Sequence, residues 1–205
     1  MKTNSKFFKN SRSLPVDKFF QNVLYDKKIG YYNSKLPFGE KGDFVTAPGV
    51  SNLFSEMIAI WIVSTWEIYG KPKNFNIVEL GPGDGSLMRT LLQVFKNFPE
   101  FNEAKKIYLF EISNLMKKLQ KKNIKDKSIK WLKNLDKIKK GPIVFFGNEF
   151  FDSIPIKQFK REKKLLFEKH YMLEKNLKIK EIFKKASIKD AKEINSFTTL
   201  KNINF

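Results

Sequence analysis

Cysteine is absent from this chain of 205 residues, and histidine occurs once, as His170. The lack of cysteine excludes disulfide bonds, cysteine-ligated zinc and a thiol nucleophile. The single histidine stands among charged residues and is expected on the surface, so no dedicated metal site is predicted. Long apolar runs are also missing. The stretch Met57–Val63 is far shorter than the roughly 20 residues that cross a bilayer, so no membrane span is expected.

Arginine is scarce although the chain is strongly basic. The formal net charge is +19, yet arginine stands only at positions 12, 89 and 161, and the other basic residues are lysines. Such a charge would suit a nucleic acid or an anionic membrane, but specific readers of nucleic acids depend on the bidentate guanidinium group. The lysines are spread along the chain, with one dense stretch at 117–140. We interpret the charge as a solvated surface and do not expect a nucleic-acid partner.

Breaker residues and hydrophobic periodicity divide the chain into three expected parts. Residues 1–72 form an N-terminal helical segment, with helices at 15–28 and 52–69 around a loop rich in glycine and proline. The many apolar residues of 52–69 predict that this helix is buried over much of its circumference. Residues 73–160 alternate strands and helices, which predicts βαβ units and a Rossmann-like α/β core with a parallel sheet. Its expected strands are 75–80, 107–112, 129–132 and 142–146, and its expected helices are 86–98 and 114–122. Residues 161–205 are predicted to form a β-meander or a mixture of strand and helix.

Three alternating glycines, Gly81, Gly83 and Gly85, connect the first strand of this core to the next helix. Glycine tolerates positive φ angles and lets a ligand approach the backbone, and the first N–H groups of a helix are free to bind it. At the carboxyl end of a parallel sheet, such a turn predicts a pocket for a nucleoside-containing cofactor. The alternative is a tight connection that binds nothing.

The residues around this turn favour S-adenosyl-L-methionine over other cofactors. Ser86 stands where the dinucleotide fingerprint has glycine or alanine, and the Gly-Lys-Ser/Thr of a phosphate-binding loop is absent. Glu79, just before the glycines, suits a cationic amino-acid ligand better than a pyrophosphate. Glu111, at the end of the next expected strand, is placed to hold ribose hydroxyl groups.

A second polar segment, Asn148–Pro155, directly follows the fourth strand of the expected core. This strand end faces the ligand crevice of an open α/β sheet. Glu149 and Asp152 are three residues apart, so a helical turn would bring their carboxylates together. They could hold a guanidinium or ammonium group, remove a proton or orient a nucleophile. The position is equally consistent with Asn148 or Asp152 capping a turn while Glu149 faces solvent.

A third segment, Gly42–Pro48, precedes the helix that contains Glu56. A glutamate among apolar residues is costly to bury alone. Glu56 is therefore expected either to meet a partner or to lie at the solvent boundary.

Several segments of the chain occur together, in the same order, in one known family. They are Tyr25–Asp26, Gly30–Tyr32, Gly42–Pro48, Leu53–Glu56, Val78–Met88 and Asn148–Pro155. On these segments, over about residues 15–160, the chain resembles the MidA-like family of class I methyltransferases that depend on S-adenosyl-L-methionine. The Gly-Asp-Phe-Val-Thr and Asn-Glu-Phe-Phe-Asp stretches are more specific to this family than the glycine turn. Mitochondrial members are complex I assembly factors that methylate an arginine of a complex I subunit.

The resemblance implies a role for each matching residue. Glu79 would lie near the methionine amino group and Glu111 near the ribose, beside the cofactor loop of Gly81, Gly83 and Gly85. The residues expected to face the acceptor are Asn148, Glu149 and Asp152. The residues expected in a segment that closes over the cofactor are Gly42, Asp43 and Thr46.

The resemblance therefore implies a methyltransferase that modifies an arginine side chain of a protein, with a complex I subunit as one candidate substrate. The family usually has Glu where this chain has Gly49, and Gly where it has Ser55. Family members are longer, so the later strands of the sheet are expected to be absent, and an inactive binding or assembly module is the alternative. We expect a cytoplasmic bacterial protein, or a mitochondrial one in a eukaryotic cell.

Overall fold

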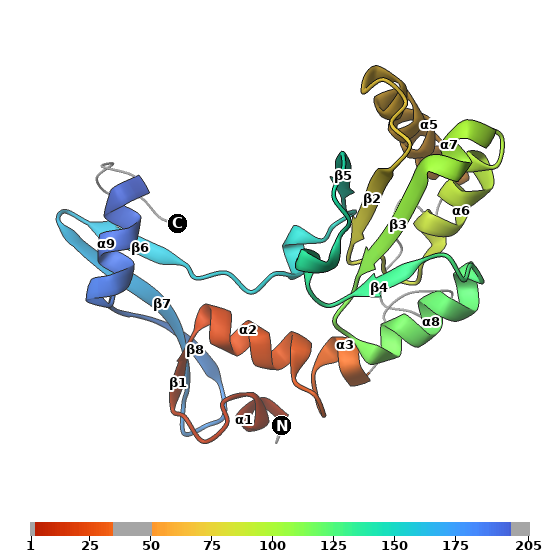
Figure 1. Ribbon diagram of the computed structural model, residues 1–205. Coiled ribbons are helices and arrows are strands. Elements are labelled where there is room, and N and C mark those ends of the chain that lie inside the picture. The colour runs from red at the N-terminus through yellow and green to blue at the C-terminus, as the bar shows by residue number, and fades with distance from the viewer. Residues whose placement is uncertain (1–2, 35–50, 198–205) are drawn as a thin grey trace. The chain divides into compact units, whose positions relative to one another are not determined.

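The computed structural model describes residues 3–34 and 51–197, which fall into two compact units (Figure 1). One unit combines residues 1–31 with 154–205, and the other contains residues 32–153. This division differs from the expected boundaries at 72 and 160, because strand pairing joins the two ends of the chain. In the described ranges, no helix is long and apolar enough to cross a membrane.

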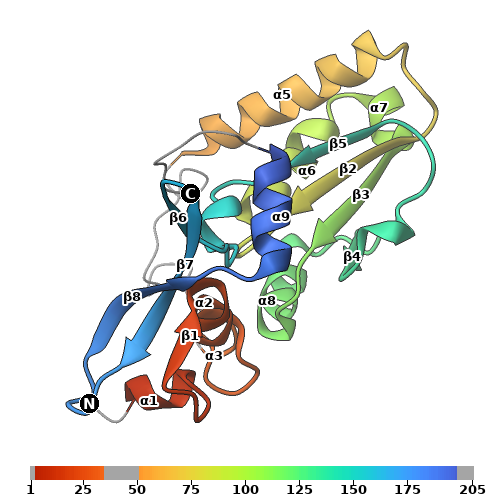
Figure 2. The ribbon, with the colours of Figure 1, turned by 90° about the vertical axis from the view of Figure 1, so that its left-hand side faces the viewer.

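The unit of residues 32–153 is built on a parallel sheet with the strand order β4-β3-β2-β5 (Figures 1 and 2). Its strands are β2 (Phe75–Leu80), β3 (Lys105–Phe110), β4 (Lys130–Leu132) and β5 (Ile143–Phe146). The central strand β2 pairs with β3 on one side and with β5 on the other. This sheet with its helices confirms the expected Rossmann-like core, and the observed strands lie within two residues of the expected ones.

The helices of this unit pack on one another, and their buried side chains share one core with the sheet. They are α5 (Asn52–Ile68), α6 (Ser86–Phe95), α7 (Pro99–Ala104) and α8 (Asn114–Ile124), with the short 3-10 turns η1 (Leu135–Lys137) and η2 (Phe151–Ser153). Side chains cap two of the helix starts: Ser51 accepts the N–H of Leu53 at 3.1 Å, and Ser113 accepts the N–H of Met116 at 3.3 Å. Each cap satisfies a backbone donor that has no partner inside its helix.

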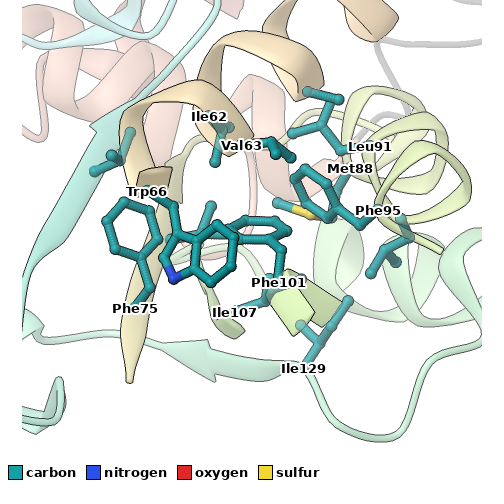
Figure 3. Close-up of a cluster of buried hydrophobic side chains, with 14 of the residues drawn as sticks. Ile62, Val63, Trp66, Phe75, Met88, Leu91, Phe95, Phe101, Ile107 and Ile129 are labelled. Carbon is teal, nitrogen blue, oxygen red and sulfur yellow. The ribbon is translucent and has the colours of Figure 1, made fainter. Parts of the chain in front are cut away.

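An aromatic and aliphatic core joins the helices to the sheet (Figure 3). At its centre Phe101 of α7 is fully buried, and its ring lies 5.3 Å from that of Trp66 and 4.9 Å from that of Phe95. Phe75 of β2 lies on a third side, with 6.1 Å between ring centroids. These contacts tie α5, α6 and α7 to the central strand and hold the start of β2 in place.

The helix α5 buries only one of its sides. That side contains Ser55, Ala59, Ile62, Val63 and Trp66, whereas Leu53 is 64% exposed and Met57 and Trp61 are also exposed. The expectation that this apolar helix is buried over much of its circumference is therefore wrong, because within the described ranges it packs mainly on α6. Glu56 faces solvent, as the boundary interpretation predicts.

The second unit is an antiparallel sheet centred on β7. Its strands are β1 (Ser13–Pro15), β6 (Phe159–Glu162), β7 (Leu165–Leu173) and β8 (Ile179–Lys185), and the helices near it in sequence are α1 (Thr3–Phe7), α2 (Val16–Tyr25), α3 (Tyr31–Ser34, at the boundary of the two units) and α9 (Ile188–Phe197). β1 pairs with β7 across more than 150 residues of sequence. The His170 residue on β7 is half-buried, with 12% of its side chain exposed, and its Nε2 atom lies 3.4 Å from Oε2 of Glu168. It is therefore less exposed than the sequence predicts.

Candidate cofactor site

The glycine turn lies at the carboxyl end of β2, where the parallel sheet presents its strand ends. Gly81, Gly83 and Gly85 have φ angles of 60°, 54° and 85°, a conformation that glycine adopts without strain. The Gly81 N–H donates to the carbonyl of Phe110 at 3.0 Å, and the Gly85 N–H donates to that of Pro82 at 2.8 Å. The turn therefore bends away from β2 directly beside the end of β3 and leads into α6.

Glu79 is a buried carboxylic acid on the last part of β2. Burial, with a smaller contribution from the negative charge of Asp84, raises its pKa to about 8. Its Oε2 atom has no hydrogen-bond partner among the described residues. A buried acceptor without a donor is costly, so this oxygen is suited to a cationic or hydrogen-bond-donating ligand.

Glu111 lies just beyond β3 and is also buried, but its carboxylate is well supported. Oε1 accepts the N–H of Ser113 at 2.7 Å, and Oε2 accepts the amide Nε2 of Gln120 at 3.0 Å. Burial raises its pKa, and these hydrogen bonds oppose the shift. The structure therefore places two buried carboxyl groups at the ends of the neighbouring strands β2 and β3, where the glycine turn begins.

Two residues near the turn, Gln120 and Phe150, were not predicted from the sequence. Gln120 of α8 donates to the carbonyl of Gly83 at 2.9 Å as well as to Glu111. It lies between Met116 and Ile124 at a spacing of four, so a polar residue in a buried helical row was the signal that could have identified it. Phe150 is the other, because a Cβ atom added to Gly81 would lie only 2.7 Å from its ring carbon Cδ2.

The segment after β5 brings Phe150, rather than a carboxylate pair, against the glycine turn. Glu149 is exposed with a left-handed φ of 53°, and Asp152 is exposed on η2. Asn148 is half-buried. No ion pair or hydrogen bond is found between these polar side chains in the described part of the chain. Their predicted role toward an acceptor stays a prediction.

The remaining predicted site residues, Gly42, Asp43 and Thr46, lie outside the described residues. Across 3–34 and 51–197, no group of three or more His, Asp or Glu side chains is arranged to hold a metal ion.

Comparison with known proteins identifies the family of the chain. The family model of S-adenosyl-L-methionine-dependent methyltransferases called Methyltransf_28 matches residues 57–202, which include both strand ends and the glycine turn. The chain belongs to this family. The match confirms the MidA-like resemblance that the sequence motifs indicate.

Several relatives carry the name of protein arginine methyltransferase. The mitochondrial protein arginine methyltransferase NDUFAF7 of Xenopus laevis is 31% identical over 179 residues, which is 76% of this chain and 41% of the relative. The Drosophila melanogaster homologue is 31% identical over 165 residues, or 70% of this chain and 38% of the relative, and the human protein is 30% identical over 177 residues, or 75% and 40%. This chain thus spans about two fifths of the length of these relatives.

A solved structure shares the fold. A COG1565 superfamily member from Burkholderia thailandensis, crystallised with S-adenosyl-homocysteine, superposes with a TM-score of 0.74 at 20% identity. The match covers 95% of this chain and 51% of that one. A native crystal structure from the same organism gives a TM-score of 0.71 at 19% identity, over 99% and 52% of the two chains.

Proposed function

We propose that this chain binds S-adenosyl-L-methionine and acts in the methylation of an arginine side chain of a protein. The observation that carries the proposal is the pair of buried carboxyl groups, Glu79 and Glu111, at the ends of neighbouring strands where a glycine turn begins. Membership of the family and the names of the relatives support it.

The chain offers a distinct group for each part of this cofactor. Glu79, with its unpartnered Oε2 atom, would receive the α-amino group of the methionine part, and Glu111 would accept hydrogen bonds from the ribose hydroxyls. Gly81, Gly83 and Gly85 leave the backbone open to close approach. When bound, the cofactor supplies an electrophilic methyl group and leaves as S-adenosyl-L-homocysteine.

The acceptor side of the site would be formed by Asn148, Glu149 and Asp152. Both carboxylates are exposed and free to meet a guanidinium group, which they could hold by charge-assisted hydrogen bonds. One of them would take the proton that the nitrogen loses as the new N–C bond forms. Catalysis would consist mainly of positioning the nitrogen in line with the methyl group. A complex I subunit as acceptor, and a bacterial cytoplasmic or a mitochondrial location, belong to this proposal.

The first test is a calorimetric titration of the folded chain with S-adenosyl-L-methionine. Glu111→Ala removes acceptors for the ribose and should weaken binding by about 10- to 100-fold, the cost of one or two hydrogen bonds to a charged group. Glu100→Ala is the matched control, because Glu100 is an exposed glutamate on α7. The absence of binding by a folded wild-type chain would contradict the proposal and favour a binding or assembly module.

A second test separates the acceptor residues from the cofactor residues. Glu149→Gln and Asp152→Asn should lower methyl transfer to arginine-containing peptides and leave cofactor affinity within about twofold, because they remove charge from the acceptor side alone. Equal losses of affinity and turnover would place these residues at the cofactor instead.

A further inference from the structure

The side chain of Gln120 joins the two predicted cofactor-binding elements. It is fully buried on α8, and its Nε2 group donates to the carbonyl of Gly83 at 2.9 Å and to Oε2 of Glu111 at 3.0 Å. These two hydrogen bonds use both N–H donors of the amide. A single side chain therefore fixes the distance between the glycine turn and the carboxylate after β3.

The orientation of this amide is determined by Trp131. The indole Nε1–H of Trp131 donates to Oε1 of Gln120 at 2.9 Å. An indole N–H can only donate, so the amide oxygen has to face Trp131 and the NH₂ group has to face Gly83 and Glu111. Every polar atom of the buried amide thus has a partner, as a buried polar group requires.

Glu111 is in turn held at both of its oxygens. Ser113 occupies one lone pair of Oε1 through its backbone N–H, and Gln120 occupies one lone pair of Oε2. The backbone N–H of Ile112 is a further hydrogen-bond donor to this carboxylate. A carboxylate offers about four lone-pair sites, so acceptor capacity is left for a hydroxyl group of a ribose.

We propose that Gln120 is a positioning residue that orients the Glu111 carboxylate and thereby sets the preference of the site for a ribose over a 2′-deoxyribose. The inference rests on the proposed function, because it assumes that Glu111 meets the ribose. It assigns to α8 a part in cofactor selectivity that is separate from its part in the core. In this proposal Gln120 acts on the ribose through Glu111, while its hydrogen bond to Gly83 supports the glycine turn.

The test compares S-adenosyl-L-homocysteine with its 2′-deoxyadenosyl analogue by calorimetry. The wild-type chain should bind the ribose form at least about tenfold more tightly, as expected when a buried acceptor loses its donor. Gln120→Met keeps the length of the side chain and removes both donors. It should weaken the ribose form by about 10- to 100-fold and the deoxy form by less than about threefold, so that the preference disappears.

Asn123 provides the matched control on the same helix. Its Nδ2 atom donates to the carbonyl of Asp84 at 2.9 Å, so it also supports the loop, but the structure shows no hydrogen bond from it to Glu111. Asn123→Ala should leave the ratio of the two affinities unchanged. If Gln120→Met is unfolded by circular dichroism, Gln120→Leu serves in its place, because it also removes the donor to Glu111 and introduces no second carboxyl group beside that residue.

The ratio of the two affinities in these proteins supports or contradicts the role of Gln120. Loss of the ribose preference in the Gln120 variant, with the preference kept in Asn123→Ala, supports the inference. If Gln120→Met loses the same factor of affinity for both ligands, Gln120 supports only the glycine turn, and the inference is overturned. A wild-type chain that binds both ligands equally would overturn it while leaving the proposed function in place, and one that binds neither would overturn both.

Discussion

Glu79 and Glu111 show how two carboxyl groups of similar burial differ through their hydrogen bonds. Glu111 receives a backbone and a side-chain donor, whereas Oε2 of Glu79 receives none among the described residues. The pKa of Glu79 is accordingly raised to about 8 by its burial, with the charge of Asp84 as a lesser cause. At neutral pH Glu79 is therefore mostly protonated in the free protein, and a bound cation would favour its ionised form.

Replacing Glu79 with glutamine should change the pH dependence of stability in a defined direction. Below a pH of about 4.5 the carboxyl group is protonated in both the folded and the unfolded chain, so it contributes no pH dependence. Between about 4.5 and 8 only the unfolded chain ionises, so the wild type loses stability as pH rises, by up to about 5 kcal/mol in total. Glu79→Gln cannot ionise, so its stability relative to the wild type should rise across this window.

The measurement is urea unfolding of both proteins at several pH values between 5 and 9. A constant difference between the two proteins across this range would show that Glu79 titrates as an ordinary glutamate.

Gly81 is predicted to be intolerant of even a methyl group, for two separable reasons. Its φ of 60° disfavours any residue with a Cβ atom, and that atom would meet Cδ2 of Phe150 at 2.7 Å. Gly81→Ala should therefore cost about 2–4 kcal/mol of unfolding free energy and weaken cofactor binding.

The control for this prediction is Gly70→Ala, since Gly70 has a φ of 77° and no neighbouring atom within 4 Å of the added Cβ. Gly70→Ala should lose about 1 kcal/mol of unfolding free energy, the cost of the positive φ angle alone. In a protein that already carries Phe150→Ala, the substitution Gly81→Ala should cost less unfolding free energy than it does in the wild type. Equal costs at positions 70 and 81 would contradict a tight contact with Phe150.

Among the helices and strands, α7 is short but lies at the centre of the core. Its Phe101 meets Trp66 of α5, Phe75 of β2 and Phe95 of α6. Phe101→Ala should lower the free energy of unfolding by about 3–5 kcal/mol, because it leaves a large cavity that the surrounding elements cannot fill. Near-ultraviolet circular dichroism of Trp66 should weaken as the packing is lost, and a loss below about 1 kcal/mol would contradict this packing.

Local patterns predicted these elements well wherever each element carries its own signal. The strand β2, the glycine turn and α6 follow one another in sequence, so alternation, breaker residues and helical spacing were enough to place Glu79 and Gly81–Gly85. The exposed side of α5 was not predictable from the sequence. An apolar residue shows that a helix can be buried there, but it does not show whether another element packs against it. The apolar pattern alone therefore overestimated the burial of Leu53 and Met57.

At the scale of the whole molecule, the two ends of the chain form one unit, and the predicted cofactor-binding residues belong to the other. The edge strand β5 pairs only with β2 in the described part of the chain, and its Phe145 is 48% exposed. The relatives extend over more than twice the matched length. The activity of a whole relative is therefore attributed to this chain only as a proposal.

The distribution of tryptophan allows the cofactor-binding unit to be followed alone. All three tryptophans, Trp61, Trp66 and Trp131, belong to the unit of residues 32–153. S-adenosyl-L-methionine at about 100 times its Kd should raise the unfolding free energy reported by tryptophan fluorescence by about 2.7 kcal/mol. The same titration with Glu111→Ala at equal ligand concentration should give a smaller increase. If the unfolding midpoint followed by tryptophan fluorescence does not change with the ligand, the ligand does not bind to this unit.

The sequence by itself determined the alternation of strands and helices, the glycine turn and the family of the chain, because each depends on neighbouring residues or on short motifs. It could not place Gln120 between Gly83 and Glu111, since 37 residues separate Gln120 from Gly83 and no local pattern records that contact. Nor could it show that β1 pairs with β7, or that Phe150 lies against Gly81. Only the tertiary structure decided these points, because hydrogen bonds and packing between distant segments form when the sheet assembles and leave no periodicity in the chain.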